Sequence, residues 1–122
     1  MDLYDIASFV RLQEIRRLAA LPYPEYLQTD WWKGRRDKAL HRARERCELC
    51  HGTAHPLEVH HTTYERRGRE NPDDLVVLCR RCHQHVEDNG LGRVPRHELL
   101  RSRREFLHSP EFQRAKHERL DY

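Results

Sequence analysis

Four cysteines carry the strongest chemical signal in this 122-residue chain. They form two Cys-x-x-Cys pairs, Cys47 with Cys50 and Cys79 with Cys82, and 28 residues separate the pairs. Each pair can fold as a tight turn and present two thiolates to one tetrahedral Zn²⁺ at about 2.3 Å. Two disulfides are the alternative, and they are disfavoured because the first residues lack the basic start of a secretory signal. Four thiolates close the coordination sphere, so this zinc is predicted to be structural rather than catalytic.

Histidines inside the same segment can supply the chemistry that a closed zinc site lacks. His60 and His61 end a short apolar run that begins at Leu57, and this pattern predicts a strand. Neighbouring side chains on a strand point to opposite faces, so the two rings have different surroundings. His83 directly follows the last cysteine, in the expected first turn of a helix. The predicted zinc site therefore positions all three histidines.

The order of these motifs in residues 47–87 resembles the HNH endonuclease family, also called the ββα-metal or His-Me finger nucleases. The sequence His60-His61-Thr62 is similar to the first histidine motif of that family, and His83 matches its last histidine. Asp74, which precedes Leu-Val-Val-Leu-Cys, stands where the family more commonly has Asn. The cysteine pairs match the zinc-stapled branch of the family. The resemblance implies an α+β fold, with a small ββα-metal core and a structural zinc flanked by N-terminal and C-terminal helices.

The resemblance also implies a role for each residue of the site. His61 is expected to be the general base and Asp74 to orient it, while His60 and His83 bind one catalytic divalent ion. Glu87 lies four residues after His83, on the same helix face, and is expected to be a further ligand. Two imidazoles favour Mn²⁺, Ni²⁺, Co²⁺ or Zn²⁺ over Mg²⁺, although the family also uses Mg²⁺.

The activity implied is metal-dependent hydrolysis of DNA phosphodiester bonds, which leaves 5′-phosphate and 3′-hydroxyl ends. The alternative is a zinc-stapled nucleic-acid-binding module that does not cut. A pure binding module needs only the cysteines and basic residues, so the histidine set favours the enzyme. The expected partner is DNA, without a membrane, and a homodimer or a targeting subunit is left open.

Basic side chains are concentrated in one stretch and one loop, which favours a surface for a polyanion. The net charge is only +3, but residues 33–46 hold seven Lys or Arg residues against two acidic ones. A solvated charged surface is the alternative for such a run. The residues predicted to contact nucleic acid are Lys33, Arg35, Arg36, Arg42 and Arg44 in this stretch, with Arg66, Arg67 and Arg69 in the loop between the strands.

The composition predicts one domain with a small core. Hydrophobic residues make up 37% of the chain and charged residues 35%, and the mean hydropathy is −1.03. A small core makes the zinc part of the folding free energy. No stretch approaches the roughly 18 apolar residues of a membrane span. Reduced thiolates and the absence of a secretory signal lead us to expect a cytoplasmic protein.

Three segments are predicted along the chain. Residues 1–28 form an N-terminal helix and connector, residues 29–89 the nuclease core with its preceding basic helix, and residues 90–122 a linker and polar C-terminal helices. The first helix, over residues 3–20, is expected to cover the core, with a dimer contact as the alternative.

The remaining elements follow from caps and periodicity. Thr29 or Asp30 can cap the basic helix, which is predicted to run to about residue 46. Asn89-Gly90 should end the helix that contains His83. Polar helices are expected near residues 96–108 and from residue 109 onward. The buried stripe of the basic helix is predicted to be Trp32, Ala39, Leu40 and Ala43.

Overall fold

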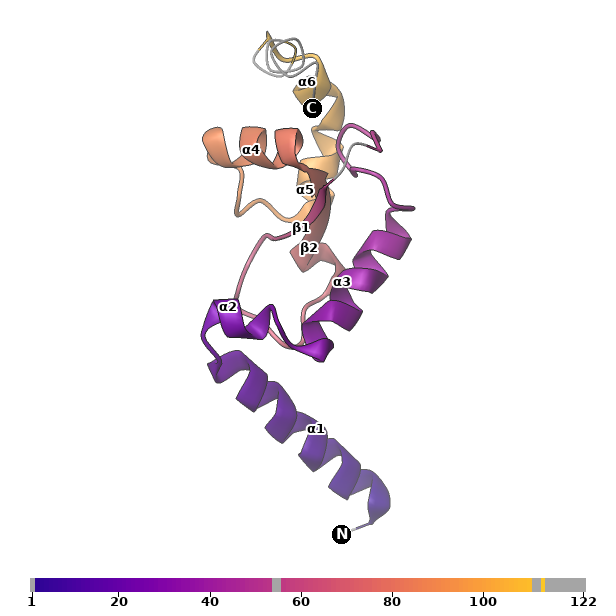
Figure 1. The fold of residues 1–122 in the computed structure, drawn as a ribbon, viewed down its shortest axis with the longest axis vertical. Helices are drawn as coiled ribbons and strands as arrows, with labels where there is room; N and C mark the ends of the chain where they lie inside the picture. Colours follow the sequence, from indigo (N-terminus) through magenta and orange to yellow (C-terminus); the bar gives the residue numbers. More distant parts are fainter. Residues whose placement is uncertain (1, 54–55, 111–112, 114–122) are drawn as a thin grey trace.

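The computed structural model describes residues 2–53, 56–110 and 113. Helices surround a small two-stranded sheet in this part of the chain, as predicted for an α+β fold (Figure 1). The elements are α1 (Leu3–Ala20), α2 (Tyr23–Tyr26), α3 (Asp30–Arg42), β1 (Leu57–His61), the 3₁₀ turn η1 (Pro72–Asp74), β2 (Leu75–Cys79), α4 (Arg80–Asp88), α5 (Arg96–Arg101) and α6 (Arg103–Leu107).

The sheet is an antiparallel hairpin whose register places His60 opposite Val76 and His61 opposite Leu75. All five residues of β2 are buried, because helices cover both faces of the hairpin. Side chains alternate between the faces, so His61 contacts α3 while His60 contacts α4. The two adjacent histidines therefore lie on opposite faces, as the strand pattern predicts.

Helix α3 starts as expected but ends early. The side chain of Thr29 accepts a hydrogen bond from the backbone N–H of Trp32 and caps the helix. The prediction of a helix to about residue 46 is wrong, because Arg44 and Glu45 have φ values of 57° and 56°. This left-handed backbone turns the chain into the first cysteine pair. Trp32, Ala39 and Leu40 are buried as predicted, and Ala43 is half-buried.

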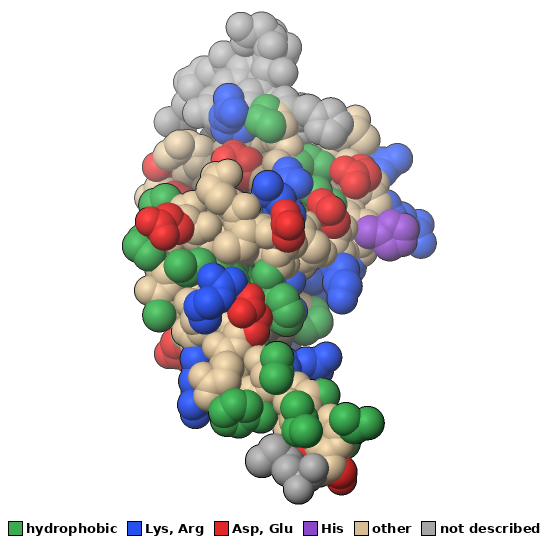
Figure 2. All heavy atoms as spheres, turned by 60° about the horizontal axis from the view of Figure 1, so that its bottom comes forward, with side chains coloured by type: hydrophobic (Ala, Val, Ile, Leu, Met, Phe, Trp, Pro, Cys, Tyr) green, Lys and Arg blue, Asp and Glu red, His purple; other side chains and the backbone are tan. Residues whose placement is uncertain are grey.

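Helix α1 does not cover the core, contrary to expectation. It extends away from the rest of the chain, with the N-terminus at its far end (Figure 1). Only Leu18, near its C-terminal end, is buried in this helix. Most of its other large apolar residues are exposed, and they are seen at the lower end of Figure 2. They are Leu3, Tyr4, Ile6, Phe9, Val10 and Leu12, which are 43–85% exposed.

The C-terminal part is broken where a single helix was expected over residues 96–108. The break between α5 and α6 falls at Ser102, whose hydroxyl donates a hydrogen bond to the carbonyl of Leu99. Helix α4 ends as predicted, with Asn89 as its cap and Gly90 at a φ of 69°. Nearly all of the helix expected from residue 109 onward lies outside the described residues. Within the described ranges, no helix combines the length and apolarity needed to cross a bilayer.

Candidate metal centres and catalytic histidines

The four cysteines converge at one point, as their spacing predicts. Their sulfur atoms all lie within 4.8 Å of one another, and the Sγ atoms of Cys50 and Cys79 are 3.9 Å apart. A tetrahedral ion with bonds of about 2.3 Å needs sulfur atoms about 3.8 Å apart. Backbone N–H groups donate to three of the sulfurs, which stabilises thiolates: Cys50 to Cys47, Gly52 to Cys50, and Cys82 to Cys79. The cluster therefore has the composition and geometry of a structural zinc site.

A second cluster of metal-binding atoms lies between β1 and α4. Nδ1 of His60 is 3.1 Å from Nε2 of His83. Oε1 of Glu87 is 3.6 Å from Nδ1 of His60 and 3.5 Å from Nε2 of His83. An ion with bonds of about 2.1 Å has ligand atoms about 3.4 Å apart in a tetrahedral arrangement. The three residues thus fit one face of a metal coordination sphere, and no further His, Cys, Asp or Glu joins them within the described part of the chain.

Neighbouring groups fix the orientation of both histidine rings in this cluster. The Nε2–H of His60 donates a hydrogen bond of 2.6 Å to the carbonyl of Gly92, which leaves Nδ1 unprotonated and facing Nε2 of His83. Burial lowers the pKa of His60 and favours the neutral ring that binds metal. Oε1 of Glu58 lies 3.6 Å from Nδ1 of His83, on the side of the ring away from the cluster.

His61 lies in a separate, aromatic environment on the other face of the sheet. Its side chain is completely buried, and its ring stacks on Trp32 at a centroid distance of 4.6 Å. The hydroxyl of Tyr23 lies 3.0 Å from Nδ1, and Oε2 of Glu70 lies 2.9 Å from Nε2. Both ring nitrogens therefore have partners.

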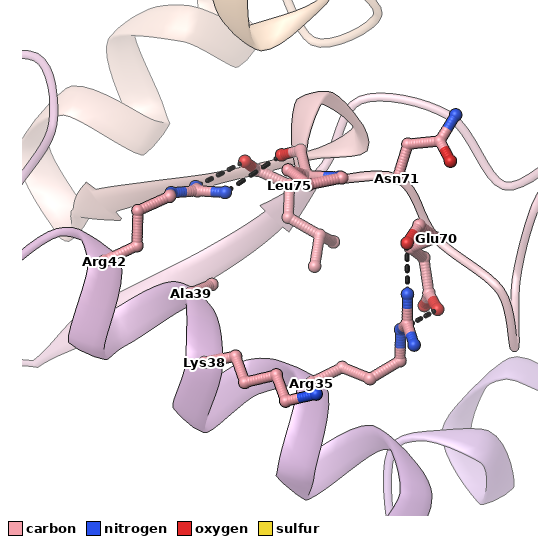
Figure 3. Close-up of a pocket in the computed structure, with 8 residues that line it drawn as sticks. Arg35, Lys38, Ala39, Arg42, Glu70, Asn71 and Leu75 are labelled. Carbon is pink, nitrogen blue, oxygen red and sulfur yellow. Dashed lines mark hydrogen bonds and ion pairs between the residues drawn. The ribbon is translucent and has the colours of Figure 1, made fainter.

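Glu70 is ionised and held from several sides. Burial by itself would raise the pKa of this carboxyl, but hydrogen bonds from His61 and Tyr26 lower it below the usual range. Arg35 extends from α3 to the same carboxylate, with its Nε 2.9 Å from Oε1 (Figure 3). Because a carboxylate only accepts hydrogen bonds, His61 carries its proton on Nε2 and leaves Nδ1 as the basic nitrogen.

The predicted contact between Asp74 and His61 is not among the hydrogen bonds of the described residues, and Glu70 takes that place. Asp74 accepts two hydrogen bonds from Arg66, of 2.6 and 2.8 Å, and one from the backbone N–H of Asn71. The bond from Arg66 lowers the pKa of Asp74. Asp74 therefore ties the loop between the strands together through Arg66 and Asn71.

Four of the eight basic residues predicted to contact nucleic acid make internal contacts. Arg35 binds Glu70, and Arg66 binds Asp74. Arg42 donates to Glu48 and to the carbonyl of Leu75, and these bonds link α3 to the sheet. Arg67 donates to the carbonyls of Ala19 and Leu21. The remaining four residues are Lys33, Arg44 and Arg69, which are exposed, and Arg36, whose side chain is 43% exposed.

Residues 47–89 match the family model described as HNH endonuclease. This segment is an HNH domain. The match begins at the first cysteine and includes both strands and α4, so the cysteine cluster and all three histidines lie in the HNH domain. Helices α1, α2 and α3 precede it, and α5 and α6 follow it. Searches of curated proteins and of solved structures gave no match.

Several residues in contact with the histidines of the HNH domain carry no signal of their own in the sequence. Tyr23 and Glu70 are 38 and 9 residues away from His61 along the chain. Gly92 lies 32 residues after His60, in a segment predicted to be a linker. Only the path of the folded chain brings them together, so motif spacing could not identify them.

Proposed function

We propose that this protein is a metal-dependent endonuclease that hydrolyses phosphodiester bonds in DNA. The observation that carries the proposal is the cluster of His60, His83 and Glu87, which lies in an HNH domain apart from the four cysteines. A structural zinc accounts for the cysteines alone. The second cluster has an incomplete ligand set, which is characteristic of catalytic metal sites.

The cluster is accessible to a substrate. An open pocket beside it is lined by Glu58, Arg80, His83, Gln84 and Glu87. A divalent ion bound to the cluster would act as a Lewis acid that withdraws charge from the phosphate and stabilises the leaving 3′ oxygen. Its mixed nitrogen and oxygen donors fit Mn²⁺, Co²⁺, Ni²⁺ or Zn²⁺ better than Mg²⁺.

We assign the role of general base to His61, with its Nδ1 as the proton acceptor. Glu70 holds the ring by its Nε2–H and stabilises the imidazolium that forms when Nδ1 takes a proton. Tyr23 donates its hydroxyl hydrogen to Nδ1 in this structure, so the hydroxyl must move aside before water reaches that nitrogen. Arg93 donates to the backbone carbonyl of His61 and fixes the end of β1.

The DNA backbone is proposed to contact the basic residues that the fold leaves exposed. These side chains carry charge but show no pattern for reading bases, so binding should depend on phosphates and on salt rather than on sequence. They are Lys33, Arg36, Arg44 and Arg69.

A nucleic-acid-binding module that does not cut is the competing function, and a nicking assay separates the two. Zinc-loaded protein is incubated with supercoiled plasmid and Mn²⁺, with and without EDTA, and the ends are identified by ligation. We expect nicks with 5′-phosphate and 3′-hydroxyl ends that disappear with EDTA and return with added Mn²⁺. Plasmid binding without nicking under any of the candidate ions would favour the binding module.

A further inference from the structure

The segment between α4 and α5, predicted to be a linker, contacts both histidines of β1. The carbonyl of Gly92 accepts the 2.6 Å hydrogen bond from Nε2 of His60. The next residue, Arg93, donates a bond of 2.8 Å to the carbonyl of His61, and its guanidinium lies over the ring of Tyr64 at 4.8 Å. Two adjacent residues of this segment therefore hold two adjacent residues of the strand.

Gly92 also lies against the carboxylate of Glu87. A Cβ atom at residue 92 would be 2.8 Å from Oε2 of Glu87 and 3.2 Å from Oε1. Real Cβ atoms essentially never approach another atom within 3.0 Å, so any side chain here requires the carboxylate to move. The backbone of Gly92 is not left-handed, unlike that of Gly68 and Gly90, so conformational freedom is not the reason for a glycine here.

We propose that Gly92 is a positioning residue for the second metal site. Its carbonyl sets the tautomer of His60, and the absence of a side chain leaves the space that Glu87 occupies as a ligand. This inference rests on the proposed function, because it assumes that His60, His83 and Glu87 hold an ion. It assigns a role in the site to a residue that lies beyond the matched residues 47–89.

Substitution of Gly92 by Ala should disturb the ligand and leave the fold intact. The atoms in the way are the end of a flexible side chain that is 45% exposed, so Glu87 can swing aside without moving the backbone. The Gly92 carbonyl that orients His60 is kept in this variant, so the expected loss comes from the displaced Glu87 carboxylate, and disturbing the groups that support a metal site typically costs about 10–100-fold in metal affinity. We expect Gly92→Ala to weaken metal binding by that factor.

The experiment is calorimetric titration of Ni²⁺ into zinc-loaded protein. It compares the wild type with Gly92→Ala and with the control Gly34→Ala, since a Cβ added at Gly34 in α3 would meet no atom within 4 Å outside its own helix turn. Circular dichroism and thermal melting establish that all three are folded. We expect Gly34→Ala to bind Ni²⁺ as the wild type does and Gly92→Ala to bind about 10–100-fold more weakly.

A double-mutant cycle with Glu87→Ala tests whether the effect passes through Glu87. Once Glu87 is truncated, adding Gly92→Ala should cost little further affinity. Equal Ni²⁺ affinity of wild type and Gly92→Ala would overturn the inference and leave the proposed metal site standing. A full additional loss in the double mutant would overturn the role of Gly92 in making room for Glu87. A wild type that binds no Ni²⁺ beyond the zinc site would overturn the site and the inference together.

Discussion

The two ring nitrogens of His61 have chemically different partners. Glu70 is an ionised, buried acceptor at Nε2, and the hydroxyl of Tyr23 is a donor at Nδ1. Glu70 in turn accepts a hydrogen bond from the hydroxyl of Tyr26 and forms an ion pair with Arg35, so residues of α2 and α3 hold it in position. The Glu70 carboxylate therefore orients the His61 ring and keeps its negative charge beside the ring when Nδ1 gains a proton.

Substitution of Glu70 by Gln should reduce cleavage about 10–100-fold, because a neutral amide stabilises the imidazolium less than a carboxylate does. Asp74→Asn is the comparison, since Asp74 hydrogen-bonds Arg66 and no hydrogen bond joins its carboxylate to His61 among the described residues. Its cleavage rate should stay within a few-fold of wild type. Plasmid nicking with both folded variants measures the difference, and the reverse ranking would return the orienting role to Asp74.

The charge on Glu70 should also appear in the pH dependence of stability. Its pKa is lowered in the folded protein, so the carboxylate stabilises the fold above the unfolded value of about 4.3. That contribution is lost as the pH falls through the folded pKa. Urea unfolding should therefore show a larger deficit for Glu70→Gln at pH 7 than at pH 3. A deficit that does not change with pH would show that the carboxylate charge contributes nothing.

Tyr23→Phe removes only the hydroxyl that covers Nδ1 of His61 and keeps the ring against Tyr64. If water must replace this hydroxyl, the variant should cleave at the wild-type rate or several-fold faster. Single-turnover nicking makes the comparison. A loss of two orders of magnitude or more would mean that the Tyr23 hydroxyl itself takes part in proton transfer.

The sequence indicates which cysteines and histidines come together, but not the residues that support them. Cysteine spacing and the position of His83 after Cys82 are local, so they can be read along the chain. The pairing of His61 with Glu70 depends on how the loop between the strands folds back. The sequence shows Glu70 only as an acidic residue in a polar loop, and nothing there indicates that it contacts His61. In the same way, nothing in the sequence indicates that Gly92 contacts His60.

Helix α3 and the residues just after it carry two kinds of basic side chain. Arg35 points to the loop and binds Glu70, while Arg42 points to the sheet and donates to the carbonyl of Leu75 (Figure 3). Arg42 also donates to Glu48. Lys33 and Arg44 are exposed, at the start of α3 and just beyond its end. The sequence locates the basic stretch. Periodicity alone cannot tell which of its arginines pair inside the fold and which are exposed, because the acceptors come from distant segments of the chain.

The triple variant Lys33→Gln, Arg36→Gln and Arg44→Gln should weaken DNA binding on every sequence and flatten its salt dependence, without loss of stability. Arg42→Gln should instead destabilise the fold by about 1–3 kcal/mol, because Glu48 and the carbonyl of Leu75 lose a donor. Binding at several salt concentrations and urea unfolding measure the two effects. An unchanged salt slope in the triple variant would place the DNA elsewhere.

The whole molecule combines a small core with an extended N-terminal helix. The core lies around the hairpin and the cysteine cluster, while most of α1 is outside it. The sequence predicts the length of α1 correctly but not its position. Apolar residues in a predicted helix indicate that the helix packs against something. They do not indicate whether it packs against the core of the same chain.

A core of this size should depend on its metal. Cys79 ends β2, caps α4 through the backbone N–H of Cys82 and contributes a sulfur to the cluster. Cys79→Ser should therefore abolish zinc binding and cooperative folding, whereas Ser8→Ala, at an exposed position of α1, should leave both unchanged. Metal analysis and thermal melting test this. A folded, zinc-free Cys79→Ser protein would contradict the structural role of the cluster.

The Mn²⁺ dependence of plasmid nicking by two variants decides whether His61 accepts the proton while His60 holds a catalytic ion. His61→Ala should lose about two to four orders of magnitude in rate at every Mn²⁺ concentration, because the base is gone and the ligands remain. His60→Ala should recover part of its activity at high Mn²⁺, because a weakened site can be filled by mass action. If His61→Ala is instead rescued by Mn²⁺ and His60→Ala is not, the two roles are assigned to the wrong histidines.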